Sequence, residues 1–226
     1  MVIFLNDLTV GRLKFNLGAL DSIYMSDTRG LLDEHDLESF RQSGVYEIFP
    51  LLRKGILHRT NPKSYWGIKE SGFIIPNQGQ FPYTYPQSKV YYAHSKGYVC
   101  LFDFESVSEE ECIFIYHTWG GFFSDQKPFT VVVRLNREIL ADELIPNSAG
   151  PKSGQEDYKS YIPFIEVWYP KPVPISAIDG YMITFWDSEA FQTRCIEYSK
   201  KQVEEFEVML VMLEEEVRKL QEANKE

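Results

Sequence analysis

A single carboxylate stands in a segment that is otherwise apolar and aromatic. Residues 161–169 read YIPFIEVWY, and strand alternation places Phe164, Glu166 and Trp168 on one side. A carboxylate among aromatic rings must find partners, shift its pKa or line a cleft, because burying it bare costs several kcal/mol. The alternative is a glutamate on an edge strand that faces water. The residues alone leave the two interpretations evenly balanced.

Histidine offers the next candidate for chemistry. His58 lies in residues 55–60, GILHRT, where a short strand runs into the start of a helix. A single histidine at a strand end is more often structural than catalytic, and the residues alone favour that interpretation. His94 and His117 also lie near expected strand ends, and the three lack the HxH or HExxH spacing of a zinc site. The sequence therefore predicts no metal.

Three tyrosines gather in residues 90–98. Tyr91 and Tyr92 are adjacent, so in a strand they point to opposite faces and only one of them can join a given pocket. Tyr98 closes the segment. Aromatic residues are commonly core residues, so these rings carry little meaning alone. The GxSxG, P-loop and GxGxxG motifs do not occur in the chain.

Taken in chain order, these segments resemble the ADP-ribosyltransferase fold of the diphtheria-toxin and poly-ADP-ribose-polymerase type, which carries a His-Tyr-Glu signature. The family's first motif is a strand that ends in H-x-T, and the chain has His58-Arg59-Thr60. A helix and a turn of the form I…SG…I.P follow in the family, and residues 68–76 read IKESGFIIP. A donor loop comes next, and residues 76–88 occupy its place.

The tyrosine and glutamate motifs of the family also have counterparts. Residues 90–93 (VYYA), followed by Ser95 and Tyr98, look similar to the strand that carries the family's tyrosines. The loop of residues 146–160 precedes Glu166, as a loop precedes the family's glutamate. The resemblance spans residues 55–186, and its specificity lies in the order of motifs that are each weak alone.

The resemblance implies chemistry on NAD+ as a substrate, with no metal. The bond between ribose and nicotinamide breaks through a transition state with oxocarbenium character, and a nearby carboxylate stabilises that charge. The family's pattern gives this catalytic role to Glu166. It also implies that His58 binds a ribose hydroxyl on the adenosine side and that Tyr91 or Tyr98 stacks on the nicotinamide. The NAD+-binding residues that it implies are His58, Arg59, Thr60, Tyr91, Ser95 and Tyr98.

The chain departs from the family at three places. Arg59 stands where glycine is usual, so its side chain must point away from the pocket or toward a phosphate. Phe164, two residues before the glutamate, replaces the Gln or Glu of arginine-modifying members. The spacer between Tyr91 and Tyr98 is shorter than usual, which leaves open which ring stacks. Positive charge near the expected cleft would serve NAD+ phosphates, nucleic acid or solubility alone, and it comes from Arg53, Lys54, Arg59, Lys63 and Lys69.

These residues need strands and helices to position them. The middle of the chain has β-branched and aromatic runs separated by Gly, Pro, Asn and Asp, which is typical of β-structure. The pattern predicts a helix over Pro62–Glu70, capped by Asn61 and ended by Gly72, and helical structure in Leu31–Leu52 with Asp36 as a cap. The predicted strands lie near residues 56–60, 73–75, 89–93, 98–104, 112–119, 129–135, 162–169 and 180–186.

The chain after Ser188 contains neither Gly nor Pro and is rich in helix formers. Its apolar residues alternate spacings of three and four, as in an amphipathic helix or a short coiled coil. Two interpretations are weighted equally: the helix packs on its own domain, or residues 196–220 join two copies of the chain. The seam consists of Val203, Phe206, Leu210, Leu213, Val217 and Leu220.

Composition narrows the classes of protein. The 226 residues suffice for a sizeable core, and 33 acidic residues exceed 23 basic ones, which argues against non-specific binding to nucleic acid or anionic membranes. No segment has the length of a membrane span, and the cysteines, at 100, 112 and 195, lack CxxC spacing. We therefore expect a reduced, soluble, cytoplasmic protein.

The sequence as a whole predicts an α+β fold with an ADP-ribosyltransferase-like split β-sheet core. We expect a partly helical N-terminal extension (1–54), the transferase-like domain (55–187) and a C-terminal amphipathic or coiled-coil helix (188–226). The expected function is transfer of ADP-ribose from NAD+ to an unidentified protein, nucleic acid or small molecule, with release of nicotinamide. The alternatives are a non-catalytic interaction module of the same fold that self-associates through its C-terminal helix, and an NAD+ glycohydrolase.

Overall fold

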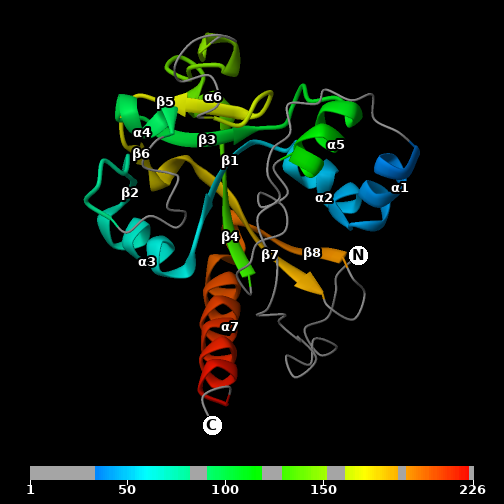
Figure 1. Ribbon diagram of the computed structural model, residues 1–226. Coiled ribbons are helices and arrows are strands. Elements are labelled where there is room, and N and C mark those ends of the chain that lie inside the picture. Colours follow the sequence, from blue (N-terminus) through cyan, green and yellow to red (C-terminus); the bar gives the residue numbers. More distant parts are fainter. Residues whose placement is uncertain (1–33, 82–90, 119–128, 152–160, 188–191, 224–226) are drawn as a thin grey trace.

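The centre of the molecule is a six-stranded antiparallel sheet (Figure 1). The computed structural model describes residues 34–81, 91–118, 129–151, 161–187 and 192–223. The strand order is β5-β3-β1-β4-β7-β8, and β2 and β6 form a separate two-stranded sheet. The predicted α+β class is therefore confirmed. The strands are β1 (Ile56–Thr60), β2 (Phe73–Ile74), β3 (Val99–Asp103), β4 (Phe129–Leu135), β5 (Glu166–Tyr169), β6 (Val173–Pro174), β7 (Ile178–Asp187) and β8 (Gln192–Ser199).

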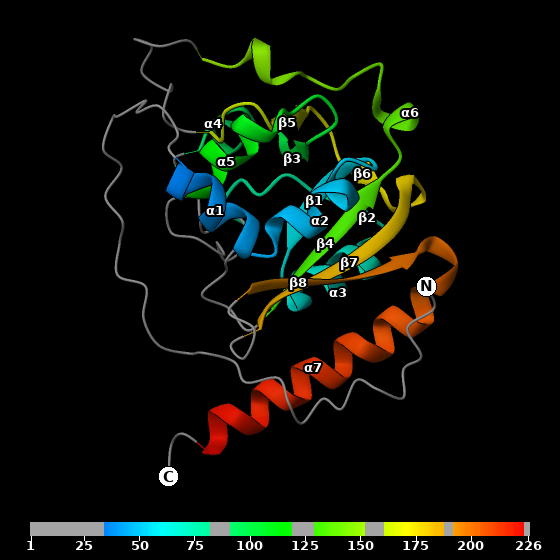
Figure 2. The ribbon, with the colours of Figure 1, turned by 90° about the vertical axis from the view of Figure 1, so that its right-hand side faces the viewer.

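Helices cover both faces of the large sheet. One core includes Val131 and Val133 of β4 and receives side chains from α3 and α7. The other includes Val132 and receives side chains from α1, α2 and α5. Figure 2 shows α7 on one side of the sheet and α1 and α2 on the other. The helices are α1 (Glu34–Gln42), α2 (Val45–Leu52), α3 (Pro62–Ser71), α4 (Tyr92–Lys96), α5 (Glu109–Thr118), α6 (Arg137–Leu140) and α7 (Val203–Ala223).

Helix α3 begins and ends where the sequence predicted. Asn61 Oδ1 accepts a hydrogen bond from Ser64 N at 2.9 Å, and Pro62 occupies the first helical position. Gly72 follows the helix with φ of 77°, a left-handed conformation that suits a residue without a Cβ. This helix directly follows β1, the strand that carries His58, and it packs on the core that it shares with α7.

The apolar seam of α7 is used inside its own domain. Phe206, Leu210 and Leu213 are buried, and the Phe206 ring stacks on Tyr181 of β7 with ring centroids 4.6 Å apart. Of the two interpretations weighted equally above, packing on its own domain is the one observed for this seam.

Polar contacts also tie α7 to α3. Tyr65 Oη donates a hydrogen bond to Glu207 Oε1 at 2.8 Å, and Trp66 Nε1 donates one to Glu214 Oε2 at 3.0 Å. The two helices therefore form one layer over the first core.

Several predicted elements are wrong. Residues 112–118, predicted as a strand, belong to α5, whose start is fixed by reciprocal bonds between Ser108 and Glu111. Residues 92–93, predicted as part of a strand over 89–93, belong to α4, which Gly97 ends with φ of 70°. Residues 192–199, expected in the C-terminal helix, form β8, which pairs with β7 along its whole length.

The N-terminal helical prediction is right in type and wrong in detail. Residues 31–33 lie outside the described residues, and the remainder is split into α1 and α2 by Ser43 and Gly44. The chain turns there because Gly44 adopts φ of 76°. Asp36 lies in the first turn of α1 and is not its cap.

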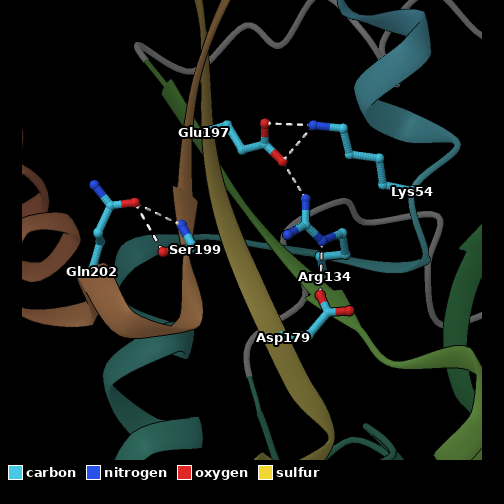
Figure 3. Close-up of polar contacts among 6 residues, drawn as sticks. All are labelled: Lys54, Arg134, Asp179, Glu197, Ser199 and Gln202. Carbon is cyan, nitrogen blue, oxygen red and sulfur yellow. Dashed lines mark hydrogen bonds and ion pairs between the residues drawn. The ribbon is translucent and has the colours of Figure 1, made fainter. Parts of the chain in front are cut away.

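Four charged residues join β4, β7 and β8 to the segment before β1 (Figure 3). Arg134 Nε donates to Asp179 Oδ1 at 2.7 Å, and Arg134 Nη1 donates to Glu197. Lys54 Nζ donates to Glu197 Oε2 at 2.8 Å. Two positive and two negative charges therefore balance around a guanidinium whose side chain is only 12% exposed.

Two glycines make room for Arg134. A Cβ at Gly180 would lie 2.8 Å from Arg134 Cζ, and a Cβ at Gly55 would lie 2.9 Å from Arg134 Cγ. Both distances are shorter than van der Waals contact, so the Arg134 side chain occupies space that side chains at these two positions would otherwise fill.

Candidate functional site

Glu166, at the start of the edge strand β5, is 1% exposed. Both carboxylate oxygens accept hydrogen bonds from inside the protein: Oε2 from Ile162 N at 2.9 Å, and Oε1 from Trp168 Nε1 at 2.8 Å. The contact with Trp168 confirms that these two side chains share one side of the strand. Of the possibilities left open above, the carboxylate has found partners and does not face water.

The surroundings of Glu166 raise the pKa of its carboxyl group close to neutral pH. Burial raises the pKa of Glu166 from 4.5 to about 7, although hydrogen bonds from Ile162 N, Trp168 and Cys100 act to lower it. Burial and then the Glu166 carboxylate hold the pKa of the Cys100 thiol well above its ordinary value. The thiol therefore stays protonated and serves as a donor, since only the thiolate is a good nucleophile.

Asn147 holds the turn that precedes β5. Its Nδ2 donates to the Glu166 carbonyl at 2.8 Å and to the Ile162 carbonyl at 3.2 Å, while its Oδ1 accepts from Phe164 N at 3.2 Å. Phe164 has φ of 68°, and its exposed ring meets Phe114 edge-on at 5.9 Å. The predicted strand over 162–169 thus begins only at Glu166, and Phe164 belongs to the turn.

Tyr91 is close enough to Glu166 for the carboxylate to affect the pKa of its phenol. Burial first, and then the Glu166 carboxylate, raise the pKa of the Tyr91 phenol above its ordinary value. Tyr98 is half-buried and packs against Tyr92, with ring centroids 6.4 Å apart. Tyr92 in turn meets the buried Trp168 at 4.7 Å. These rings pack on one another in a small core beside Glu166.

His58 contacts the backbone of the neighbouring strand. Its Nδ1 lies 3.2 Å from the Cys100 carbonyl oxygen. A carbonyl can only accept, so Nδ1 carries the proton of the neutral ring and Nε2 does not. Burial lowers the pKa of His58 to about 4, against the effect of this hydrogen bond. At neutral pH the ring is therefore uncharged.

The register separates His58 from Glu166. His58 pairs with Val133, which belongs to the core under α3 and α7. Glu166 pairs with Phe102, which belongs to the core under α1, α2 and α5. Directly opposed residues share a face of an antiparallel sheet, so the two side chains leave opposite faces. Only β3 lies between the strands of the two residues, but their side chains point to opposite sides of the sheet.

Of the other predicted NAD+-binding residues, Arg59 and Thr60 lie on opposite faces of the sheet, and Ser95 lies on α4. Thr60 pairs with Val131 on the His58 face, and Arg59 pairs with Val132 on the Glu166 face. Ser95 is exposed, and its Oγ donates to the Tyr92 carbonyl at 2.9 Å within α4.

The further residues that contact Glu166 are Cys100, Asn147, Ile162 and Trp168. The spacing of two between Glu166 and Trp168 carried a signal for their contact, because strand alternation gives both the same side. Cys100 and Asn147 reach Glu166 through strand pairing and a distant turn, and no local pattern marks them.

Neither a metal-binding group nor a membrane-spanning helix occurs in the ranges that the structure describes. These ranges contain no group of three or more His, Cys, Asp or Glu side chains placed to hold a metal ion. None of their helices combines the length and the apolar character that crossing a bilayer requires. Of the two long loops, residues 82–88 and 152–160 lie outside those ranges.

Comparison with known proteins adds no relative: no protein-family model, curated protein or solved structure matches the chain.

Proposed function

We propose that this protein is a non-catalytic interaction module built on an α+β scaffold. The observation that carries the proposal is the state of Glu166, which is closed to solvent and has each carboxylate oxygen bonded inside the protein. Its role is to hold the turn of residues 162–166 and the Trp168 ring, a structural task.

A catalytic role would require Glu166 to leave these partners. The Ile162 N–H and the Trp168 indole N–H would each lose an acceptor, at about 1–3 kcal/mol per unsatisfied buried donor. His58 would still lie on the opposite face of the sheet. One NAD+ molecule could not touch both side chains without a rearrangement of the strands.

The experiment measures NAD+ binding by calorimetry and nicotinamide release by chromatography, with the wild type and the E166Q variant compared. We expect neither binding nor release from the wild type. Release by the wild type that E166Q loses, with circular dichroism showing the variant equally folded, would overturn the proposal.

The second candidate is the NAD+-consuming enzyme of ADP-ribosyltransferase type, with its split sheet. One observation favours it: Tyr91 and Glu166, far apart in sequence, are close enough for the carboxylate to affect the phenol's pKa. If nicotinamide is released, the products separate its two forms. Free ADP-ribose would indicate a hydrolase, and a modified acceptor would indicate a transferase.

A further inference from the structure

The turn that leads into β5 contains a strained residue. Phe164 has φ of 68°, and among the residues that the structure describes it is the one non-glycine residue with positive φ. This conformation costs free energy in a residue with a Cβ, because the Cβ approaches the backbone carbonyl oxygen. The side chain is 44% exposed, so burial of the ring does not hold the backbone in this conformation. The hydrogen bonds of the turn must do so.

One of these hydrogen bonds depends on a titratable group. Glu166 N donates to the Ile162 carbonyl at 3.1 Å, and Phe164 N donates to Asn147 Oδ1 at 3.2 Å. The turn is also closed from its other side, where Ile162 N donates to Glu166 Oε2 at 2.9 Å. Among these acceptors, only the Glu166 carboxylate can gain a proton near neutral pH.

The partners of the Glu166 carboxylate are donors. Ile162 N and Trp168 Nε1 can only donate, and the Cys100 thiol donates as well, with a sulfur that accepts weakly. This arrangement fits an ionised carboxylate, which accepts at both oxygens. A proton on either oxygen finds no good acceptor among these partners and makes that oxygen a weaker acceptor. One of the two N–H bonds therefore weakens when Glu166 is protonated.

The bond to Ile162 N is the one expected to yield. The Trp168 ring is fully buried, and it meets Tyr92 at 4.7 Å and Tyr161 at 5.5 Å between ring centroids, so neighbouring rings hold it in place. The turn, in contrast, has an exposed residue at its tip, and the strain at Phe164 favours opening.

We propose that residues 162–166 form a proton-sensitive turn: the ionised Glu166 carboxylate keeps the turn closed, and protonation releases Ile162 N and lets Phe164 return to a negative φ. Binding of one proton at a buried group thereby moves an exposed aromatic ring. Because burial raises the pKa of Glu166 to about 7, against the effect of its hydrogen bonds, the change falls near neutral pH. The inference goes beyond the proposed function, since it concerns how the molecule changes and not what it binds.

Other titratable or charged groups share this side of the sheet. Burial first, and then the Glu166 carboxylate, raise the pKa values of the Cys100 thiol and the Tyr91 phenol. Arg59 of β1 lies on the same face and stays charged. The helices packed on this face contribute the Cys112 thiol, whose pKa burial raises to about 12. Glu166 is therefore the one of these groups that changes its charge near neutral pH.

The test follows amide hydrogen exchange and the Trp168 indole by NMR from pH 5.5 to 8.5 in the full-length chain. The indole N–H signal reports the charge of Glu166, because Nε1 lies 2.8 Å from Oε1. As Glu166 gains its proton, exchange at the Ile162 and Phe164 amides, corrected for intrinsic rates, should become about tenfold faster. The Gly72 amide, which ends α3, is the internal reference and should keep its rate.

Three variants separate the parts of this response. E166Q cannot ionise, so exchange at Ile162 should be fast and independent of pH. F164G removes the strain, because glycine adopts positive φ freely, so the indole should still titrate while the turn stays closed. F114A is the matched control: it removes the ring that meets Phe164 edge-on and keeps the strain, so it should respond as the wild type does. Circular dichroism confirms that each variant keeps its helices.

The inference fails if the indole signal does not titrate between pH 5.5 and 8.5, or if it titrates while exchange at Ile162 and Phe164 stays constant. It fails equally if E166Q keeps the wild-type response, or if F164G opens at low pH as the wild type does. Nicotinamide release is a separate measurement, so NAD+ turnover would overturn the proposed function and leave the proton-sensitive turn standing.

Discussion

Glu166 and His58 are expected to affect stability in opposite directions over one pH range. The pKa of Glu166 is raised from 4.5 to about 7, so the folded state holds its proton more tightly than the unfolded state does. The stabilisation that this proton gives to the folded state is present below pH 4.5 and is lost as the pH rises through about 7. The pKa of His58 is lowered from 6.5 to about 4. The stability of the folded state with a neutral His58 ring is therefore fully present above pH 6.5 and is lost as the pH falls through about 4.

Glu166 and His58 change the free energy of unfolding by similar amounts. A change from 4.5 to about 7, at about 1.4 kcal/mol per pH unit, corresponds to about 3 kcal/mol. The change from 6.5 to about 4 gives about 3 kcal/mol of opposite sign. In the wild type the two slopes nearly cancel, so the single variants are needed to separate them.

The assay is urea denaturation followed by circular dichroism at a series of pH values from 4 to 7.5, for the wild type, E166Q and H58N. Asn is chosen at 58 because its amide can replace the Nδ1 donor. The free energy of unfolding of E166Q relative to the wild type should rise by about 3 kcal/mol between pH 4.5 and 7, and that of H58N should fall by about 3 kcal/mol between pH 4 and 6.5. Groups common to all three proteins cancel in these differences. A difference that stays flat across its range would refute the reasoning for that residue.

Two further predictions concern packing, and both are checked by the free energy of unfolding in urea. G180A should destabilise the fold by about 1–3 kcal/mol because the new Cβ meets the Arg134 guanidinium, whereas the control G67A, with no atom within 4 Å, should stabilise α3 by about 0.5–1 kcal/mol; equal effects would contradict the crowding argument. F206A should cost about 3–5 kcal/mol because it removes a ring that is fully buried and stacked on Tyr181, and a loss below about 1 kcal/mol would show that α7 is not held by this contact.

Local sequence signals predict α3 correctly and predict a strand where α5 lies. The limits of α3 were predictable because Asn61, Pro62 and Gly72 each satisfy a requirement of a helix end. Helix α5 differs from the predicted strand because its aromatic and β-branched residues favour a strand, whereas the capping bonds between Ser108 and Glu111 start a helix.

The C-terminal prediction failed for a related reason. The absence of Gly and Pro after Ser188 is compatible with a helix, but it permits a strand equally well. In β8, Cys195 and Glu197 point to one face and Ile196 and Tyr198 to the other, the period of two that marks a strand.

The candidate site could be predicted only as far as the spacing within one strand allowed. The shared side of Glu166 and Trp168 followed from alternation. The face from which His58 departs depends on how β1 pairs with β3 and β4, and shifting that register by one residue would reverse it. Register is set by the whole sheet, so no local motif could reveal that His58 and Glu166 lie on opposite faces.

The space around Arg134 has a consequence for how the chain can change over time. Its guanidinium fills the volume that Gly180 leaves empty, its aliphatic stem lies against Gly55, and its charge is matched by Asp179 and Glu197. A smaller neutral residue at 134 would leave a void and remove the partner of Asp179, while a larger residue at Gly180 would displace the guanidinium. Positions 134 and 180 are therefore expected to be inherited as a pair, whereas a Cβ at position 55 would also lie 2.9 Å from the Leu135 carbonyl oxygen, whatever residue stands at 134.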